Sequence, residues 1–216
     1  MQDVDVGTIV PSTRDLLQVL GTRRRNLALL GLISGETSVP AEEAARLADL
    51  NVSAFAFAAP GPALAHAARA TKTVPSLCLA AAADREALLS ARQHGADGVV
   101  LDARLPPATW DQLARIARSM RMLPVALAVD AASVEIAVKA GARAILVQAG
   151  TADEVLTLAA GAPRTVVLVG HVEGGADLAT ASSALRALAG KVDAAVVPTS
   201  VHAAPGFADL VAEVDP

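Results

Sequence analysis

Eight short apolar runs, each followed by a stretch with helical periodicity, constrain the fold of this chain more than any other feature. The runs lie at residues 27–33, 54–58, 76–80, 98–101, 125–129, 144–147, 166–169 and 194–197. The helical stretches lie at residues 40–50, 62–70, 84–94, 107–120, 132–140, 151–160, 177–189 and 205–214. Eight repeats of a strand and a helix are typical of a closed barrel of parallel strands. We therefore predict an α/β fold, a (β/α)8 TIM barrel with shortened βα loops and a short N-terminal helix over residues 14–20.

The length and composition fit one compact unit. The chain has 216 residues, 53% of them apolar, which is enough for one large core. Residues 1–11 show no periodicity and are expected to form a flexible tail. No linker or low-complexity segment interrupts the remainder, so residues 12–216 are predicted to be a single barrel domain.

Charge and cysteine content narrow the possible partners and the compartment. The net charge is −4, and the one dense basic run, Arg23-Arg24-Arg25, is too narrow for a nucleic-acid surface. No apolar run reaches the roughly 20 residues of a membrane span, and the first residues lack the pattern of a signal peptide. A single cysteine, Cys78, fits a reducing compartment. We expect a cytoplasmic protein with no nucleic-acid or membrane partner.

The ends of the apolar runs carry few groups that could act as acids or bases. Barrel enzymes place their chemistry at the carboxyl ends of the strands. Here Leu30, Leu32, Leu79 and Ala128 occupy those ends and are expected to line an apolar mouth. The sequence therefore predicts no catalytic residue there. Strand alternation turns Cys78 away from the mouth, and we expect it to be a buried, inert thiol.

One part of the sequence resembles a known enzyme family. Residues 88–101, a helix followed by Gly95-Ala96-Asp97 and a strand, are similar to indole-3-glycerol phosphate synthase, which closes a ring in tryptophan biosynthesis. The similarity continues through residues 110–117, 125–129 and 137–145, and Arg14-Asp15-Leu16-Leu17 looks like the helix that precedes the family's first strand. The resemblance covers roughly residues 12–212 and implies the same barrel fold.

The family's catalytic groups are replaced in this chain. The residues at the matching positions are Leu30, Leu32, Leu79, Ala128, Gln148 and His171. The family's ring closure requires lysine and glutamate side chains for proton transfer, which leucine and alanine cannot replace. The resemblance thus implies a pseudoenzyme, a catalytically inactive barrel that is not an enzyme and acts as a scaffold or binds an unknown protein partner through its apolar mouth.

A second interpretation keeps a site for a small molecule. It makes the chain a barrel that binds a small molecule or a phosphate, with a different or residual lyase activity. The proposed ligand-binding residues are Gln148, His171, Gly174, Gly175, Thr199 and Ser200. Loops after the last two strands of such barrels often bind phosphate through backbone N–H groups. Pro198 has no N–H to offer, and Asp177 is placed to cap the following helix itself.

Histidines at the rim of the predicted barrel suggest metal binding or acid–base catalysis as further interpretations. His171 and His202 follow neighbouring strands, and Asp102 and Asp130 lie elsewhere on the same rim. Two histidines and a carboxylate can bind zinc. The spacing matches no known ligand motif, however, so we expect hydrogen-bonded rim histidines, no metal and no cofactor.

Overall fold

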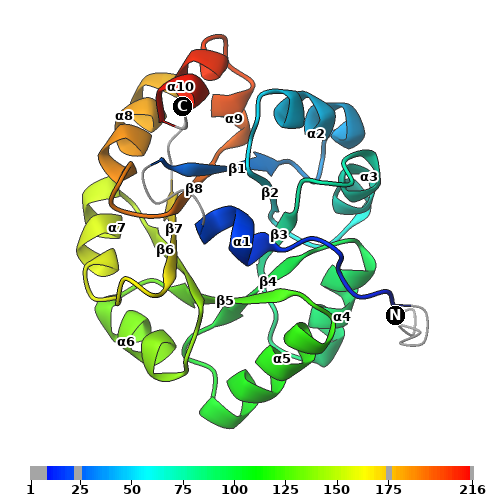
Figure 1. Cartoon of the computed structure of the whole chain (residues 1–216), viewed down its shortest axis with the longest axis vertical. Coiled ribbons are helices and arrows are strands. Elements are labelled where there is room, and N and C mark those ends of the chain that lie inside the picture. Colours follow the sequence, from blue (N-terminus) through cyan, green and yellow to red (C-terminus); the bar gives the residue numbers. More distant parts are fainter. Residues whose placement is uncertain (1–8, 22–25, 174–176, 215–216) are drawn as a thin grey trace.

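The computed structural model describes residues 9–21, 26–173 and 177–214, and it forms a closed barrel of eight parallel strands in the order β1 to β8 (Figure 1). The strands are β1 (Ala28–Ile33), β2 (Ala54–Phe57), β3 (Ser76–Ala81), β4 (Gly98–Asp102), β5 (Leu123–Ala128), β6 (Ala144–Ala149), β7 (Val167–Val172) and β8 (Ala194–Val197). The predicted TIM barrel is confirmed. Most strand ends fall within two residues of the predicted ones, and β7 extends further, to Val172.

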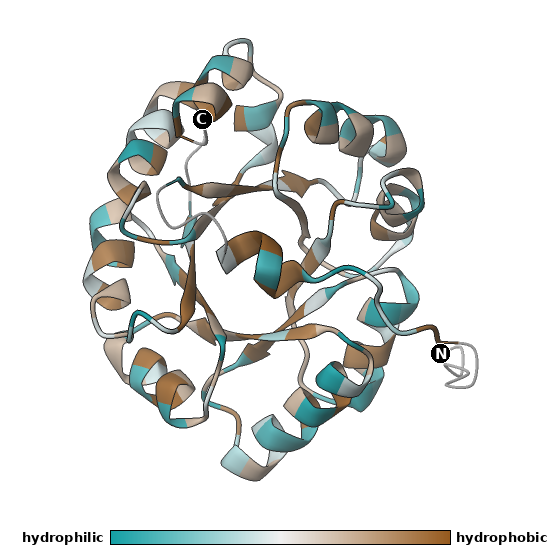
Figure 2. Ribbon diagram, in the orientation of Figure 1, coloured by the Kyte–Doolittle hydropathy of each residue, from teal (hydrophilic) through white to brown (hydrophobic). Residues whose placement is uncertain are grey.

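Helices surround the barrel, as the alternation predicts. They are α2 (Pro40–Asp49), α3 (Pro62–Ala70), α4 (Arg85–Gln93), α5 (Pro107–Ser119), α6 (Ala131–Lys139), α7 (Ala152–Ala159), α8 (Leu178–Leu188), α9 (Thr199–His202) and α10 (Phe207–Val214). Side chains cap several helix starts. Asp84, Asp130, Thr151 and Asp177 each accept a hydrogen bond from a backbone N–H in the first helical turn. The helices are amphipathic, while the strands are almost uniformly apolar (Figure 2).

Two apolar cores hold the barrel together. The first lies inside the barrel and contains Leu30, Leu77, Val100 and Leu146, each at most 1% exposed. The second lies between the strands and the helices and contains Cys78, as the alternation predicts. Burial raises the pKa of the Cys78 thiol. Since the barrel interior is filled by side chains, a ligand must lie above this packed layer.

Helix α1 (Leu16–Gly21) closes the N-terminal end of the barrel (Figure 1). Leu16 and Leu20 are buried and belong to the core inside the barrel. Gly98 at the start of β4 leaves room for this helix, because a Cβ atom there would lie 2.4 Å from Leu16 Cδ2. The short helix predicted from the sequence therefore closes the N-terminal opening of the barrel.

Some expectations fall on residues that the structure does not describe. Residues 1–8 of the expected tail, the run Arg23-Arg24-Arg25, and Gly174 and Gly175 all lie outside the described ranges. Within those ranges, no helix has the length and apolar character to cross a membrane. The cytoplasmic location stays a prediction.

Candidate functional site at the barrel mouth

Three leucines form the floor of the barrel mouth. Leu32, Leu79 and Leu127 come from the ends of β1, β3 and β5, are partly exposed, and pack on the core inside the barrel. Their side chains point inward because side chains alternate along each strand. The mouth is thus a shallow apolar surface over a filled interior.

The predicted set of mouth residues is correct at two positions and wrong at two. Leu32 and Leu79 lie at the mouth, but Leu30 is fully buried one layer below. Ala128 points the other way, into the core under the helices, and Leu127 takes the mouth position. A shift of one residue moves a side chain to the opposite face of a strand. Leu123 and Val125 belong to the core inside the barrel, so alternation along β5 places Leu127, and not Ala128, at the mouth.

A polar arc lies on the side of the mouth formed by β4, β6 and β7. Gln148 on β6 is paired in register with His171 on β7. The Nε2 atom of Gln148 donates a hydrogen bond to Glu173 Oε1. Asp102 at the end of β4 accepts a hydrogen bond of 2.8 Å from the Arg104 backbone N–H. Beside the Gln148–Glu173 pair, a hollow of about 500 Å³ extends outward toward α7. These groups can hydrogen-bond the hydroxyl groups of a small ligand.

His171 has the most unusual environment in this arc. Its Nδ1 atom is buried and has no hydrogen-bond partner among the residues that the structure describes. Burial lowers the pKa of the imidazole, and the charge of Glu173 opposes that shift only in part. At neutral pH the ring is therefore uncharged and able to accept a proton.

The second rim histidine has a structural role. His202 is buried, its Nε2–H donates to the Leu32 carbonyl at 2.8 Å, and its Nδ1 accepts from Arg46 Nη2 at 3.1 Å. These partners fit the neutral ring with its proton on Nε2, and burial lowers the pKa of this ring too. The hydrogen-bonded rim histidine expected from the sequence is confirmed for His202.

The carboxylate of Asp130 is already engaged by hydrogen bonds to the helix that it begins. This carboxylate caps α6, and the hydrogen bonds from Ser133 hold the pKa of Asp130 below its usual range. The Arg104 guanidinium pairs with the same carboxylate. No group of three or more His, Cys, Asp or Glu side chains in the described ranges is placed to hold a metal ion.

The predicted phosphate-binding residues are only partly brought together. Thr199 Oγ1 donates to the Leu32 carbonyl at 2.5 Å, so its proton is already used, while Ser200 is exposed. Asp177 accepts from the Thr180 N–H at 2.9 Å and so caps the start of α8, as the sequence suggested. Gly174 and Gly175 lie outside the described residues. Ligand binding by Gln148, His171 and Ser200 stays a prediction.

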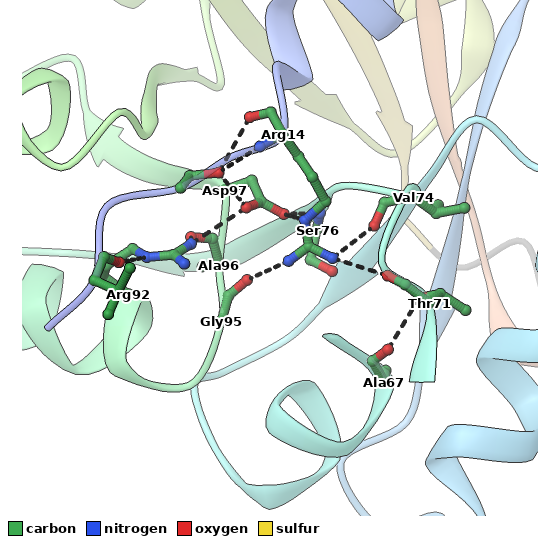
Figure 3. Close-up of polar contacts among 11 residues, drawn as sticks. Arg14, Ala67, Thr71, Val74, Ser76, Arg92, Gly95, Ala96 and Asp97 are labelled. Atoms are coloured by element: carbon green, nitrogen blue, oxygen red, sulfur yellow. Dashed lines mark hydrogen bonds and ion pairs between the residues drawn. The ribbon is translucent and has the colours of Figure 1, made fainter. Parts of the chain in front are cut away.

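The motif that carries the family resemblance lies at the other end of the barrel. Asp97 of Gly95-Ala96-Asp97 is fully buried, and its carboxylate accepts from Ser12 Oγ at 2.5 Å and from the Ser76 N–H at 2.9 Å (Figure 3). Arg14 Nε lies 2.8 Å from the same carboxylate, and Arg92 Nη1 lies 3.2 Å from it. This network fastens the N-terminal segment to the barrel and contacts nothing at the mouth.

Comparisons with known proteins match the fold of the chain. No known family model and no curated protein sequence matches it. A structure of 3-hexulose-6-phosphate synthase is 18% identical, with a TM-score of 0.67 over 87% of this chain and 98% of that one. The same enzyme from Salmonella typhimurium is 20% identical over the same shares, also with a TM-score of 0.67. N-acetylmannosamine-6-phosphate 2-epimerase from Clostridium perfringens is 13% identical, with a TM-score of 0.67 over 88% and 92%.

These comparisons correct the family resemblance. The similar structures are a sugar-phosphate synthase and a sugar-phosphate epimerase, so the assignment to indole-3-glycerol phosphate synthase and tryptophan biosynthesis is wrong. Because that family assignment is wrong, the interpretation of the chain as an inactive scaffold of the family is wrong too. The alternative of a residual lyase activity falls for the same reason. The physical reason is the place of the motif, because residues at the N-terminal end of a barrel support its stability rather than its chemistry.

Proposed function

We propose that this chain is an enzyme that converts a small sugar phosphate at the barrel mouth. The similar solved structures are named as enzymes for phosphorylated sugars, which supports this class of substrate. At these identities the likeness itself extends to the fold alone. The reaction is therefore argued from the side chains at the mouth.

The observation that carries the proposal is the environment of His171. This ring is uncharged at neutral pH, since burial lowers its pKa, and it lies beside Gln148 at the rim. A neutral imidazole can take a proton from a hydroxyl group, or from a carbon next to a carbonyl group, and return it. We assign this proton transfer to His171.

The neighbouring side chains would orient the substrate. Gln148, Glu173 and Asp102 offer amide and carboxylate groups to sugar hydroxyls, and the hollow beside the Gln148–Glu173 pair gives room for the chain of the sugar. The apolar floor of the mouth, formed by Leu32, Leu79 and Leu127, would exclude water from the side of the substrate that faces the barrel interior. Ser200 is the exposed hydroxyl on the β8 side that we assign to the phosphate.

Hydrogen–deuterium exchange followed by NMR tests the proposal. The protein is incubated in D2O with a panel of aldose and ketose phosphates, and with the matching sugars that lack phosphate. We expect deuterium to enter one phosphorylated sugar at a carbon next to its carbonyl group. His171→Gln should slow this exchange by roughly 10² to 10⁴.

A matched variant serves as the control. His66→Gln makes the same change on the exposed face of α3 and should leave exchange unaltered. Exchange that survives His171→Gln would contradict the role of this ring. If no sugar phosphate in the panel binds or exchanges, or only sugars without phosphate do, the proposed substrate class is wrong.

A further inference from the structure

A second cavity, of about 360 Å³, lies at the N-terminal end of the barrel, opposite the mouth. On one side it is lined by the segment around Asp15 and Leu17. On the other side it is lined by the end of α5, the start of β5 and Arg143. In Figure 1 this region lies near α1, at the end of the barrel that faces the viewer.

Three arginine side chains at this cavity have no partner among the described residues. Arg118, Arg121 and Arg143 are exposed, and no side-chain hydrogen bond or ion pair within the described ranges engages their guanidinium groups. Arg14 also lines the cavity, but Asp97 holds its guanidinium. Of the described residues that line the cavity, Asp15 alone is acidic, and it accepts a hydrogen bond of 3.0 Å from the Gln18 N–H at the start of α1. The cavity therefore carries a clear excess of positive charge.

Backbone carbonyl groups beside these arginines already accept hydrogen bonds, so their negative ends do not oppose a bound anion. Arg118 lies in the last turn of α5, and Arg121 follows with a φ of 55°, a left-handed conformation that is uncommon for a residue with a long side chain. Carbonyl groups at the end of a helix normally repel an anion. Here the Ala117 carbonyl accepts from the Met120 and Met122 N–H groups, and the Met120 carbonyl accepts from the Ser12 N–H.

We propose that this cavity, which we call the basal arginine pocket, binds a small organic phosphate. Guanidinium groups bind phosphate oxygens through paired, charge-assisted hydrogen bonds, and Arg118, Arg121 and Arg143 are the cations available for this. Leu17, Met122 and Pro124 form an apolar lining for the organic part of the ligand. A volume of 360 Å³ is typical of a site for one small molecule.

The pocket is independent of the proposed reaction at the mouth. It joins two parts of the molecule, because the segment before α1 and the end of α5 both line it. A bound anion would bridge them and would stabilise the docked α1 helix. We therefore expect ligand binding to raise the melting temperature.

Titration with inorganic pyrophosphate tests this site. The full chain is titrated by calorimetry and melted at constant ionic strength, with chloride as the comparison ion. We expect saturable binding of one pyrophosphate and a melting temperature that rises with its concentration. Arg118→Gln and Arg143→Gln should each weaken binding about tenfold, the loss typical of one hydrogen bond between charged groups.

Two matched variants separate this site from its alternatives. Arg115→Gln removes the same charge from the same helix, but Arg115 pairs with Asp111 outside the pocket, so binding should persist. Ser200→Ala, which removes the hydroxyl that we assign to phosphate at the mouth, should also leave pyrophosphate binding unchanged. The proposal fails if binding is not saturable, if Arg115→Gln weakens it as much as Arg118→Gln, or if the double variant Arg118→Gln/Arg143→Gln still binds as tightly.

Discussion

The two ends of this barrel differ in how their charged and polar side chains are paired. At the N-terminal end, the fully buried carboxylate of Asp97 is surrounded by Arg14, Arg92, the Ser12 hydroxyl and the Ser76 N–H, and α1 seals the opening. At the C-terminal end, partly exposed leucines adjoin a polar arc in which the Nδ1 atom of His171 has no partner among the described residues. The first end pairs its buried charges, although the buried hydroxyls of Ser53 and Ser76 have no partner among the described residues, and the second leaves polar groups at the rim.

This difference explains why a recognisable motif gave the wrong family. Gly95-Ala96-Asp97 belongs to the end that holds the barrel closed. Arg14 also donates to the carbonyls of Thr71 and Val74 at 3.0 Å, and so joins three parts of the chain (Figure 3). Any barrel that closes in this way can use such a motif, whatever reaction it catalyses.

The largest effect should come from a charge placed in the filled interior rather than at the mouth. Leu77 is fully buried, while Leu79, two residues further along β3, is partly exposed. Leu77→Lys should lower the free energy of unfolding by on the order of 5 kcal/mol or more, because it buries an unpaired cation. Leu79→Lys can extend its ammonium group to water and should cost less than about 1 kcal/mol. Equal losses in urea melts would show that the mouth is as closed as the interior.

The next effect sharpens the contrast between carboxylates at the two ends. Asp97→Ala leaves Arg14 and Arg92, whose side chains are 11% and 12% exposed, without their shared partner. We expect a loss of roughly 3 to 5 kcal/mol in unfolding free energy. Asp102→Ala at the mouth should cost about 0.5 kcal/mol or less. If the two losses measured by chemical denaturation were similar, the N-terminal network would not be the main electrostatic support of the fold.

The smallest effect is the pH dependence that the mouth histidines confer. Burial lowers the pKa of His171 and of His202 in the folded protein, below the ordinary value of 6.5. As the pH falls through 6.5, the unfolded chain therefore takes up protons before the folded one, and stability decreases. Above that pH neither ring contributes to the slope. His202→Gln should flatten the loss between pH 7 and pH 5 in thermal melts, and the exposed His66→Gln should not.

Much of the architecture follows from local sequence. Apolar runs of the right length predicted all eight strands. The helical stretches predicted to begin at Asp84 and Thr151 begin in the structure with those residues as caps, because these features depend on neighbours along the chain. Gly95 and Gly141 have positive φ angles, as expected at helix ends. The candidate site was predicted less well, since Ala128 was assigned to the mouth in place of Leu127.

Sequence alone thus determined the alternation of strands and helices, and with it the closed barrel. Only the tertiary structure decided which side of each strand faces the mouth, because that depends on register between neighbouring strands. It also decided that Asp97 serves the fold, while His171 lies at the mouth with its Nδ1 atom unpartnered among the described residues. Partners of a buried charge come from distant segments, as Ser12 and Asp97 do across 85 positions, and no local pattern records such a contact.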